Sequence, residues 1–156
     1  MIANSYRGFT LIETLVVVGI VGILISLSVA GLRGAQSSAR DSQRKTDLQD
    51  IRSALEIYKT DCGVYPSEPL PWGGQLIGND GANCPASNVY MTQVPQDPQN
   101  ATKGYKYEYV TNGTFTTYAL CAKAENSSTS PTTCAGAVGR NCSTGGASCN
   151  YRLNNP

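Results

Sequence analysis

The 156-residue chain contains no histidine and has a formal net charge of only +1. Histidine is the commonest general base near neutral pH and the commonest metal ligand in proteins. The chain also lacks a Gly-x-Ser-x-Gly elbow, a phosphate-binding loop and a dinucleotide-binding glycine fingerprint. A balanced charge creates no long-range field that would attract nucleic acid or acidic substrates. These absences argue against an enzyme and do not indicate nucleic-acid binding, and we expect neither a cofactor nor a bound metal.

No charged residue lies between Glu13 and Arg33. The residues from Thr14 to Leu32 are almost wholly aliphatic. As a helix that rises about 1.5 Å per residue, they would span close to the roughly 30 Å hydrocarbon thickness of a bilayer. The apolar centre of a secretory signal peptide is shorter, roughly 7–15 residues. We therefore expect a transmembrane helix in this part of the chain.

Three small residues, Gly22, Ser26 and Ala30, share one face of this expected helix because they lie four residues apart. Small residues at this spacing let two helix backbones approach closely in a membrane. Apolar helices also contain glycine by chance, so the pattern leaves both helix packing and a chance arrangement open.

Glu13 stands at the start of the apolar stretch, directly after Gly8-Phe9-Thr10-Leu11-Ile12. A carboxylate at the mouth of a membrane-spanning segment is costly unless another charge meets it there. A facing ammonium group would make the charged form tolerable. Alternatively, Glu13 only occupies the first helical turn, where the helix dipole favours acidic side chains. The two explanations are compatible.

The run from Gly8 to Glu13, followed by a long apolar helix, resembles the class III leader of type IV pilins and of the pseudopilins of type II secretion. The resemblance implies that a membrane-embedded prepilin peptidase removes residues 1–8 by cutting the Gly8–Phe9 bond and then methylates the new amino terminus at Phe9. It implies that Glu13 neutralises the Phe9 amine of a neighbouring subunit when identical subunits assemble into a helical filament. Further partners implied are an assembly ATPase and an inner-membrane platform protein.

Residues 33–61 are predicted to continue the helix. The part from Arg33 to Asp47 is polar on every side, whereas apolar residues recur beyond it at intervals of three and four. Gly63 is placed to cap the helix at its C-terminal end. The apolar stripe consists of Leu48, Ile51, Leu55, Tyr58 and Cys62. We therefore predict one helix from Phe9 to Asp61, with a membrane-spanning and filament-core half (9–32) and an amphipathic half (33–61) that packs on a sheet.

The region after the helix is predicted to form a small antiparallel sheet, so the fold class is α+β. Residues 62–104 are rich in proline, glycine and asparagine and should form a long loop; within them, the stretch 94–98 looks like a short motif that precedes the sheet in many pilins and pseudopilins. Residues 105–124 should form a β-hairpin, with strands at 105–110 and 114–122 and a turn at Asn112-Gly113. Tyr105, Tyr107 and Tyr109 should then cover one face of the sheet.

All six cysteines lie in the last part of the chain and fit no zinc site, because there is neither a Cys-x-x-Cys pair nor a histidine. We expect disulfides that staple the loops of a head outside the cytoplasm. Cys62 should pair with Cys84, and Cys121, Cys134, Cys142 and Cys149 should pair among themselves. The glycine-, serine- and cysteine-rich region 125–156 contains little apolar surface and cannot build a core by itself.

The resemblance implies a structural subunit, and we favour a type IV pilin. Such a chain would be held in the cytoplasmic membrane with its head outside the cytoplasm and then extracted into a pilus on the cell surface. Major pseudopilins of type II secretion are known as a family for a calcium site in an acidic loop near the C-terminus. Because no carboxylate follows Glu125, we expect no calcium here and prefer a pilus subunit over a secretion pseudopilin.

Three alternatives stay open. The first is a pseudopilin whose short filament pushes folded cargo through a type II secretion channel. The second is a minor or competence pilin whose head binds a surface in adhesion, or DNA in DNA uptake, although the balanced charge does not favour DNA. The third is a membrane-tethered domain that never polymerises, in which the Gly8–Phe9 bond would stay uncut.

Overall fold

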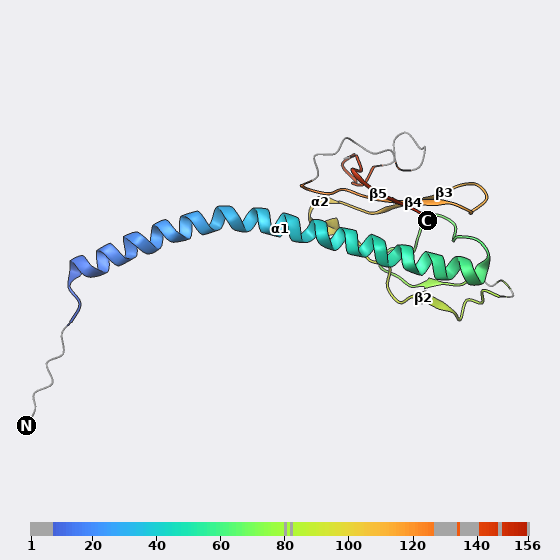
Figure 1. Cartoon of the computed structure of the whole chain (residues 1–156), viewed down its shortest axis with the longest axis horizontal. Coiled ribbons are helices and arrows are strands. Elements are labelled where there is room, and N and C mark those ends of the chain that lie inside the picture. Colours follow the sequence, from blue (N-terminus) through green and yellow to red (C-terminus); the bar gives the residue numbers. More distant parts are fainter. Residues whose placement is uncertain are drawn as a thin grey trace, which may run out of the picture. The chain divides into compact units, whose positions relative to one another are not determined.

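The computed structural model of the chain describes residues 8–79, 81, 83–126, 134, 141–146 and 148–155, without the side chains at positions 29, 30 and 33. The chain divides into two compact units, Met1–Ser37 and Ser38–Pro156, and the second is called the head below. The elements in chain order are α1 (Leu11–Cys62), β1 (Leu76–Ile77), β2 (Val89–Met91), α2 (Asn100–Lys103), β3 (Glu108–Thr111), β4 (Tyr118–Ala122) and β5 (Tyr151–Asn154) (Figure 1). The predicted α+β fold class is confirmed.

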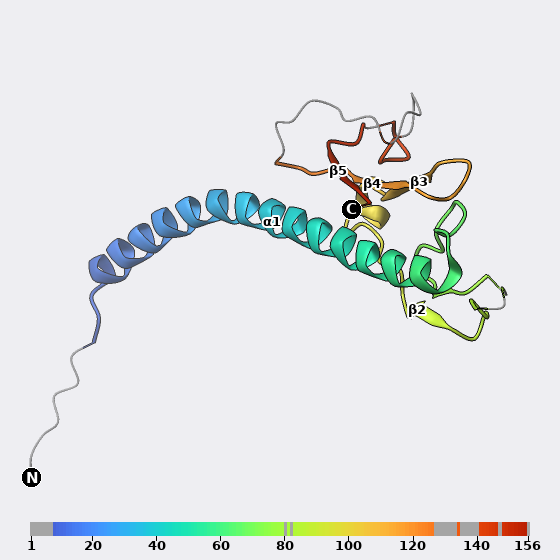
Figure 2. The ribbon, with the colours of Figure 1, turned by 45° about the vertical axis from the view of Figure 1, so that its right-hand side comes forward.

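The C-terminal half of α1 forms the centre of the head. The three-stranded antiparallel sheet, in the order β3-β4-β5, lies on one side of it, and the antiparallel pair β1-β2 lies on the other (Figures 1 and 2). The predicted apolar stripe faces this core: Leu48, Ile51, Leu55 and Tyr58 are all buried, and Cys62 packs against them partly buried. The periodic spacing of these residues therefore identified the face of α1 that packs in the head.

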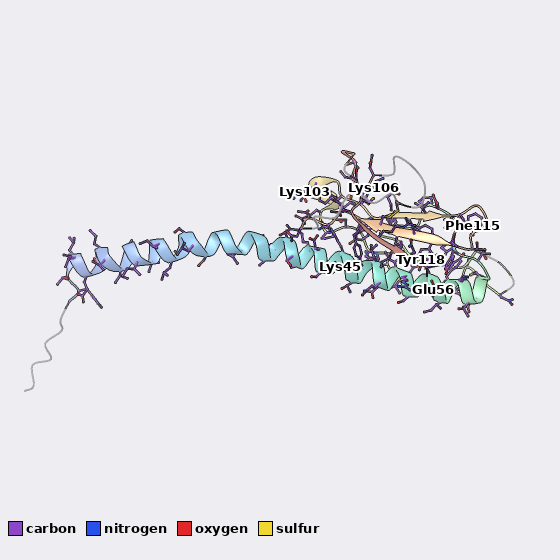
Figure 3. The ribbon with its side chains drawn as sticks, turned by 45° about the horizontal axis from the view of Figure 1, so that its top comes forward. Lys45, Glu56, Lys103, Lys106, Phe115 and Tyr118 are labelled. Carbon is purple, nitrogen blue, oxygen red and sulfur yellow. A yellow bond between two sulfur atoms is a disulfide. The ribbon has the colours of Figure 1, made fainter. Side chains whose placement is uncertain are left out.

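Contacts of Glu56 tie α1 to the sheet at the far end of the stripe. Glu56 on α1 and Tyr118 on β4 lie toward one another (Figure 3), and the Tyr118 hydroxyl donates to Glu56 Oε1 at 3.1 Å. The Tyr65 hydroxyl also donates to the Glu56 carboxylate, at 3.0 Å. One half-exposed carboxylate thus satisfies two tyrosine hydroxyls whose rings pack in the core.

Helix α1 ends at a left-handed glycine, as the sequence predicts. Gly63 has φ +77°, and its N–H donates to the Lys59 carbonyl at 2.8 Å. This φ is costly for a residue with a side chain, which explains why glycine suits the position.

Strand β4 is buried on both faces because two separate cores lie against it. Side chains alternate along a strand, so Tyr118, Leu120 and Ala122 face α1, whereas Ala119 and Cys121 face the opposite side. On that opposite side they join a second cluster. Its members are Val110, Ala119, Cys121, Cys134, Cys142 and Cys149.

The strand and loop boundaries in the head differ from the predictions. Residues 62–104 contain the short pair β1-β2 and the helical turn α2 in addition to loop, and the C-terminal region supplies β5, which pairs with β4. These strands are two to four residues long. They are too short to carry a recognisable alternation, so their pairing partners, rather than local sequence, determine them.

The predicted two-residue turn at Asn112-Gly113 is wrong. The β3–β4 connection runs from Asn112 to Thr117, and the Asn112 side chain organises it. Asn112 Oδ1 accepts hydrogen bonds from the backbone N–H groups of Thr116 and Thr117 at 2.8 and 3.1 Å. The loop is also anchored from outside, since Tyr65 N–H donates to the Phe115 carbonyl at 2.8 Å. Phe115 itself stands at the end of the sheet (Figure 3).

Only two of the three predicted tyrosines cover the sheet. Tyr107 and Tyr109 are buried in the main core, where the Tyr109 hydroxyl donates to the Pro66 carbonyl at 2.8 Å. Tyr105 is only half-buried and lies outside the main core, and the Arg44 guanidinium and the Lys103 ammonium lie 5.6 and 5.7 Å from the centre of its ring. The prediction that all three lie on one face of a strand is therefore wrong for Tyr105.

Candidate assembly site and the charge network of the head

The first turn of α1 holds the predicted assembly residues. Gly8 and Phe9 precede the helix, and the Phe9 side chain is exposed. Thr10 and Glu13 contact each other reciprocally: Thr10 N–H donates to Glu13 Oε2, and Glu13 N–H donates to Thr10 Oγ1, both at 3.4 Å. This is the arrangement of a capping box, which satisfies N–H groups left unpaired at a helix start. It supports the alternative in which Glu13 has a local helical role, and it leaves a pairing across subunits open.

Helix α1 presents an unbroken apolar surface after Glu13. All large aliphatic side chains from Leu11 to Leu27 are exposed. Val21, the least exposed of them, still has an exposed fraction of 45%. The part of α1 from Leu11 to Ser28 is long and apolar enough to cross a membrane. Side chains of this kind gain free energy when they leave water, at about 25 cal/mol per Å². This surface therefore requires lipid or other apolar helices around it.

The polar groups within this surface are satisfied by the helix itself. The Ser26 hydroxyl donates to the Ile23 carbonyl at 2.7 Å, and the Ser28 hydroxyl donates to the Leu24 carbonyl at 2.9 Å. Gly22 is on the surface, with nothing within 4 Å of the place where a side chain would begin. The Ala30 side chain lies outside the described residues. The close helix packing predicted for Gly22, Ser26 and Ala30 stays a prediction.

The head contains a charge network that the sequence did not predict. Arg44, on the part of α1 expected to be polar on every side, is only 1% exposed. Its Nε and Nη2 donate to the two carboxylate oxygens of Asp97 at 2.7 and 3.1 Å. Its Nη1 donates to Asp41 at 2.8 Å and to Glu125 at 3.0 Å. One buried guanidinium thus connects α1 with two segments that are distant in sequence.

Asp41 and Arg40 complete the attachment of the segment around Glu125. Asp41 accepts hydrogen bonds from the backbone N–H groups of Glu125 and Asn126, each at 2.8 Å. Arg40 binds both oxygens of the Glu125 carboxylate, at 2.7 and 2.9 Å. Two-point pairing of a guanidinium with a carboxylate fixes direction as well as distance. The chain leaving β4 is therefore held on the polar part of α1.

The protonation of these groups follows from their surroundings. The hydrogen bonds and charge of Arg40 and Arg44 lower the pKa of Glu125 to about 2 against the opposing effect of burial. Burial acts to raise the pKa of Asp41, but the backbone N–H groups and Arg44 outweigh it, and the pKa is lowered. Burial likewise acts to lower the pKa of Arg44, but the hydrogen bonds that its guanidinium donates to Asp97 and Glu125 raise the pKa above its usual value. All three groups are charged at neutral pH.

The sequence contains part of the information that would predict this charge network. The motif Val94-Pro95-Gln96-Asp97-Pro98 marks the Asp97 segment, and Arg44 lies in a helical stretch without an apolar face. A helix that is polar on every side can be solvated or can pack through paired charges, and the sequence does not distinguish the two. The pairing of Arg44 with Asp97 and Glu125 depends on contacts between segments more than fifty residues apart.

The six cysteines form three disulfides. Cys62 pairs with Cys84, which is the pairing that the sequence predicted, and it joins the end of α1 to the following loop. Cys121 pairs with Cys134, and Cys142 pairs with Cys149, so the other four pair among themselves. Four of these half-cystines lie in the second core on the outer face of the sheet.

Two family models match the chain. The model described as prokaryotic N-terminal methylation motif matches residues 3–29, and the model described as type II secretion system (T2SS), protein G matches residues 32–135. The chain belongs to the type II secretion system protein G family. The match to this family spans the second half of α1 and strands β1 to β4, so it covers most of the head.

Several curated members of the protein G family are similar to this chain over two thirds or more of their own length. The type II secretion system core protein G of Pseudomonas aeruginosa is 34% identical over 76% of this chain and 85% of its own. The core protein G of Vibrio cholerae is 33% identical over 70% of this chain and 74% of its own, and that of Pectobacterium carotovorum is 36% identical over 61% and 67%. No solved structure matches the chain. The comparisons therefore favour the pseudopilin alternative over the type IV pilin that the sequence suggested.

The calcium site expected for major pseudopilins does not fit this member of the protein G family. Calcium takes about 6–8 oxygen ligands, including carboxylates. No Asp or Glu follows Glu125 in the sequence, and the Glu125 carboxylate is bound by Arg40 and Arg44. Among the described residues, no three acidic, histidine or cysteine side chains gather where they could hold a metal ion. The sequence had suggested that the missing acidic residues indicate a pilus subunit. Because this chain belongs to the protein G family and still lacks them, their absence does not indicate a pilus subunit.

Removing the buried guanidinium should destabilise the head strongly. We expect Arg44→Met to lower the free energy of unfolding by about 3–5 kcal/mol, because the Asp97 carboxylate would remain buried without its charged partner. Lys45→Met is the matched control: Lys45 is exposed, its ammonium lies 5.9 Å from the Tyr151 ring, and its loss should cost less than about 1 kcal/mol. Urea unfolding of the detergent-solubilised full chain, followed through the single tryptophan, measures both. Equal effects of the two substitutions would contradict this role of Arg44.

The head should lose stability in acid through Glu125. Its pKa is lowered to about 2 in the folded chain from an ordinary 4.5, so the unfolded chain binds the proton more tightly. The stabilisation is complete above the ordinary pKa and is lost as the pH falls from there toward 2. In Glu125→Gln, unfolding free energies measured at about pH 5 and about pH 3 should differ less than in the unaltered chain. An identical acid dependence in both proteins would exclude Glu125 as the responsible group.

Proposed function

We propose that this chain is a pseudopilin, a structural subunit that polymerises through α1 into the short filament of a type II secretion system. The observation that carries the proposal is the combination of an exposed, uncharged α1 surface with a head that matches the protein G family. The match to the N-terminal methylation motif supports processing of the chain before assembly. A type IV pilus subunit has the same kind of helix, but the head favours the secretion family.

The proposed maturation begins at the Gly8–Phe9 bond. A prepilin peptidase cuts this bond, removes residues 1–8 and methylates the amine of Phe9. Gly8 and Phe9 precede the helix and are exposed, which is consistent with access by a protease. Before assembly, α1 anchors the chain in the cytoplasmic membrane and the head lies outside the cytoplasm, where its disulfides can form.

Glu13 would then set the register between subunits. In the filament, its carboxylate pairs with the methylated Phe9 amine of a neighbouring subunit. The hydrogen bonds between Thr10 and Glu13 are long, 3.4 Å, and both groups are exposed in the single chain. The carboxylate therefore retains acceptor capacity for a second, charged partner. An ion pair removed from water is favourable only when both charges are present, so assembly would require correct processing.

Assembly exchanges one apolar environment for another. The side chains from Leu11 to Leu27 leave lipid and pack against the same segments of neighbouring subunits. Because lipid and helix surfaces are similarly apolar, this transfer supplies little free energy by itself. An assembly ATPase acting through an inner-membrane platform protein would therefore provide the work, and these two proteins and the peptidase are the partners we propose.

Substitution of Glu13 should separate processing from assembly. In cells that carry the secretion system, Glu13→Gln should reduce filament assembly and secretion at least tenfold, because the uncharged amide cannot neutralise the Phe9 amine. Mass spectrometry of the membrane fraction should still find the tryptic peptide from Phe9 to Arg33, heavier by one methyl group. Ser28→Ala on the same helix is the matched control, since the Ser28 hydroxyl only binds its own helix, and it should assemble normally.

The state of the Gly8–Phe9 bond and the effect of deleting the chain distinguish the alternatives. A chain that is never cut at Gly8–Phe9 would be a membrane-tethered domain. If deletion of the chain removes long surface fibres while secreted proteins still reach the medium, the chain is a pilus subunit. Normal secretion by the Glu13→Gln variant would contradict the proposed pairing.

A further inference from the structure

The second core of the head is made mainly of sulfur. It lies on the face of the sheet opposite α1, and four of its six members are half-cystines that are fully buried. The stretch from Asn126 to Asn150, which contributes three of them, contains a single large apolar residue, Val138, outside the described part of the chain. Hydrophobic burial by ordinary side chains therefore supplies little of what holds this stretch on the sheet.

The Cys121–Cys134 disulfide attaches this stretch to the centre of the sheet. Cys121 is paired in β4 between β3 and β5, opposite Glu108 on one side and Arg152 on the other. Its partner Cys134 is also fully buried. This covalent bond therefore holds Cys134 on the sheet without relying on the burial of large apolar side chains.

The Cys142–Cys149 disulfide closes a loop that leads directly into β5. The loop is bonded to the segment after α2, since Lys106 N–H donates to the Cys142 carbonyl and Thr144 N–H donates to the Gly104 carbonyl, both at 2.9 Å. Asn150, next to Cys149, exchanges hydrogen bonds with the backbone of Ala124 at 2.6 and 2.9 Å. The edge strand β5 therefore begins where this disulfide ends.

We infer that two cystines, Cys121–Cys134 and Cys142–Cys149, replace a bound calcium ion as the device that holds the C-terminal segment on the sheet, so that the head matures by thiol oxidation and independently of calcium. For each pair, two thiols lose two protons and two electrons and form one S–S bond. A thiol–disulfide oxidoreductase outside the cytoplasm accepts the electrons, and its own disulfide is reduced to two thiols. The inference rests on the protein G family but not on filament assembly.

The test uses the oxidised full chain in detergent and compares removal of calcium with reduction. An excess of EGTA should leave the midpoint of thermal unfolding unchanged within about 1 °C, and added calcium should not raise it. Reduction with dithiothreitol should lower the midpoint by roughly 10 °C or more, because each disulfide restricts the unfolded chain. A fall on EGTA treatment comparable with the fall on reduction would overturn the inference.

Trypsin cleavage after Arg152 reports on β5 itself. Arg152 is in β5, paired with Cys121 of β4, and should be protected in the oxidised chain. The double variant Cys142→Ser/Cys149→Ser should be cut there at least tenfold faster, whereas the matched control Cys62→Ser/Cys84→Ser, which removes a disulfide on the other side of α1, should stay protected. Protection of Arg152 in the first variant would contradict the inference. Partial reduction of the folded chain gives the same readout if that variant fails to fold, and Glu13-dependent assembly is measured separately.

Discussion

The uncharged surface of α1 must be kept out of water, and this requirement constrains the rest of the chain. From Leu11 to Leu27 the large aliphatic side chains have no partner in the described structure other than their own helix. The head therefore cannot use this half of α1 for its core. It builds that core from the second half, where Leu48, Ile51 and Leu55 are buried against the sheets. One helix thus serves two surroundings, an external apolar one and the interior of the head.

In the polar part of α1, before the apolar stripe begins, paired charges replace apolar packing. Arg44 is buried on a helical segment that has no apolar face, and a buried guanidinium is stable only when carboxylates surround it. Asp97 and Glu125 meet this need from two distant loops, and Asp41 binds the backbone next to Glu125. The network therefore determines where those loops lie on α1. On the outer face of the sheet, disulfides hold in place a segment that has almost no apolar side chains.

Local patterns in the sequence predicted the parts of the fold that depend on near neighbours. The spacing of Leu48, Ile51, Leu55 and Tyr58 revealed the packed face of α1, and Gly63 marked its end, because both features follow from helix geometry. Strand β5 and the partners of Arg44 could not be predicted, since they depend on contacts between distant segments. The Asn112 loop was misread because a side chain, rather than a two-residue turn, closes it. The sequence favoured a pilus subunit, whereas the comparisons favour a secretion pseudopilin. Missing acidic residues indicate that a metal does not fit, and they do not indicate which machine uses the subunit.

We propose that α1 leaves the membrane to form the core of a filament while the head stays folded around its second half. Electron cryomicroscopy of filaments assembled from the full chain tests it most directly. We expect a core made of residues 9–32 of neighbouring subunits, with each Glu13 carboxylate within ion-pair distance of a Phe9 amine and each Arg44 still bound to Asp97. A filament whose core is formed by the heads, or in which Glu13 faces water, would contradict it.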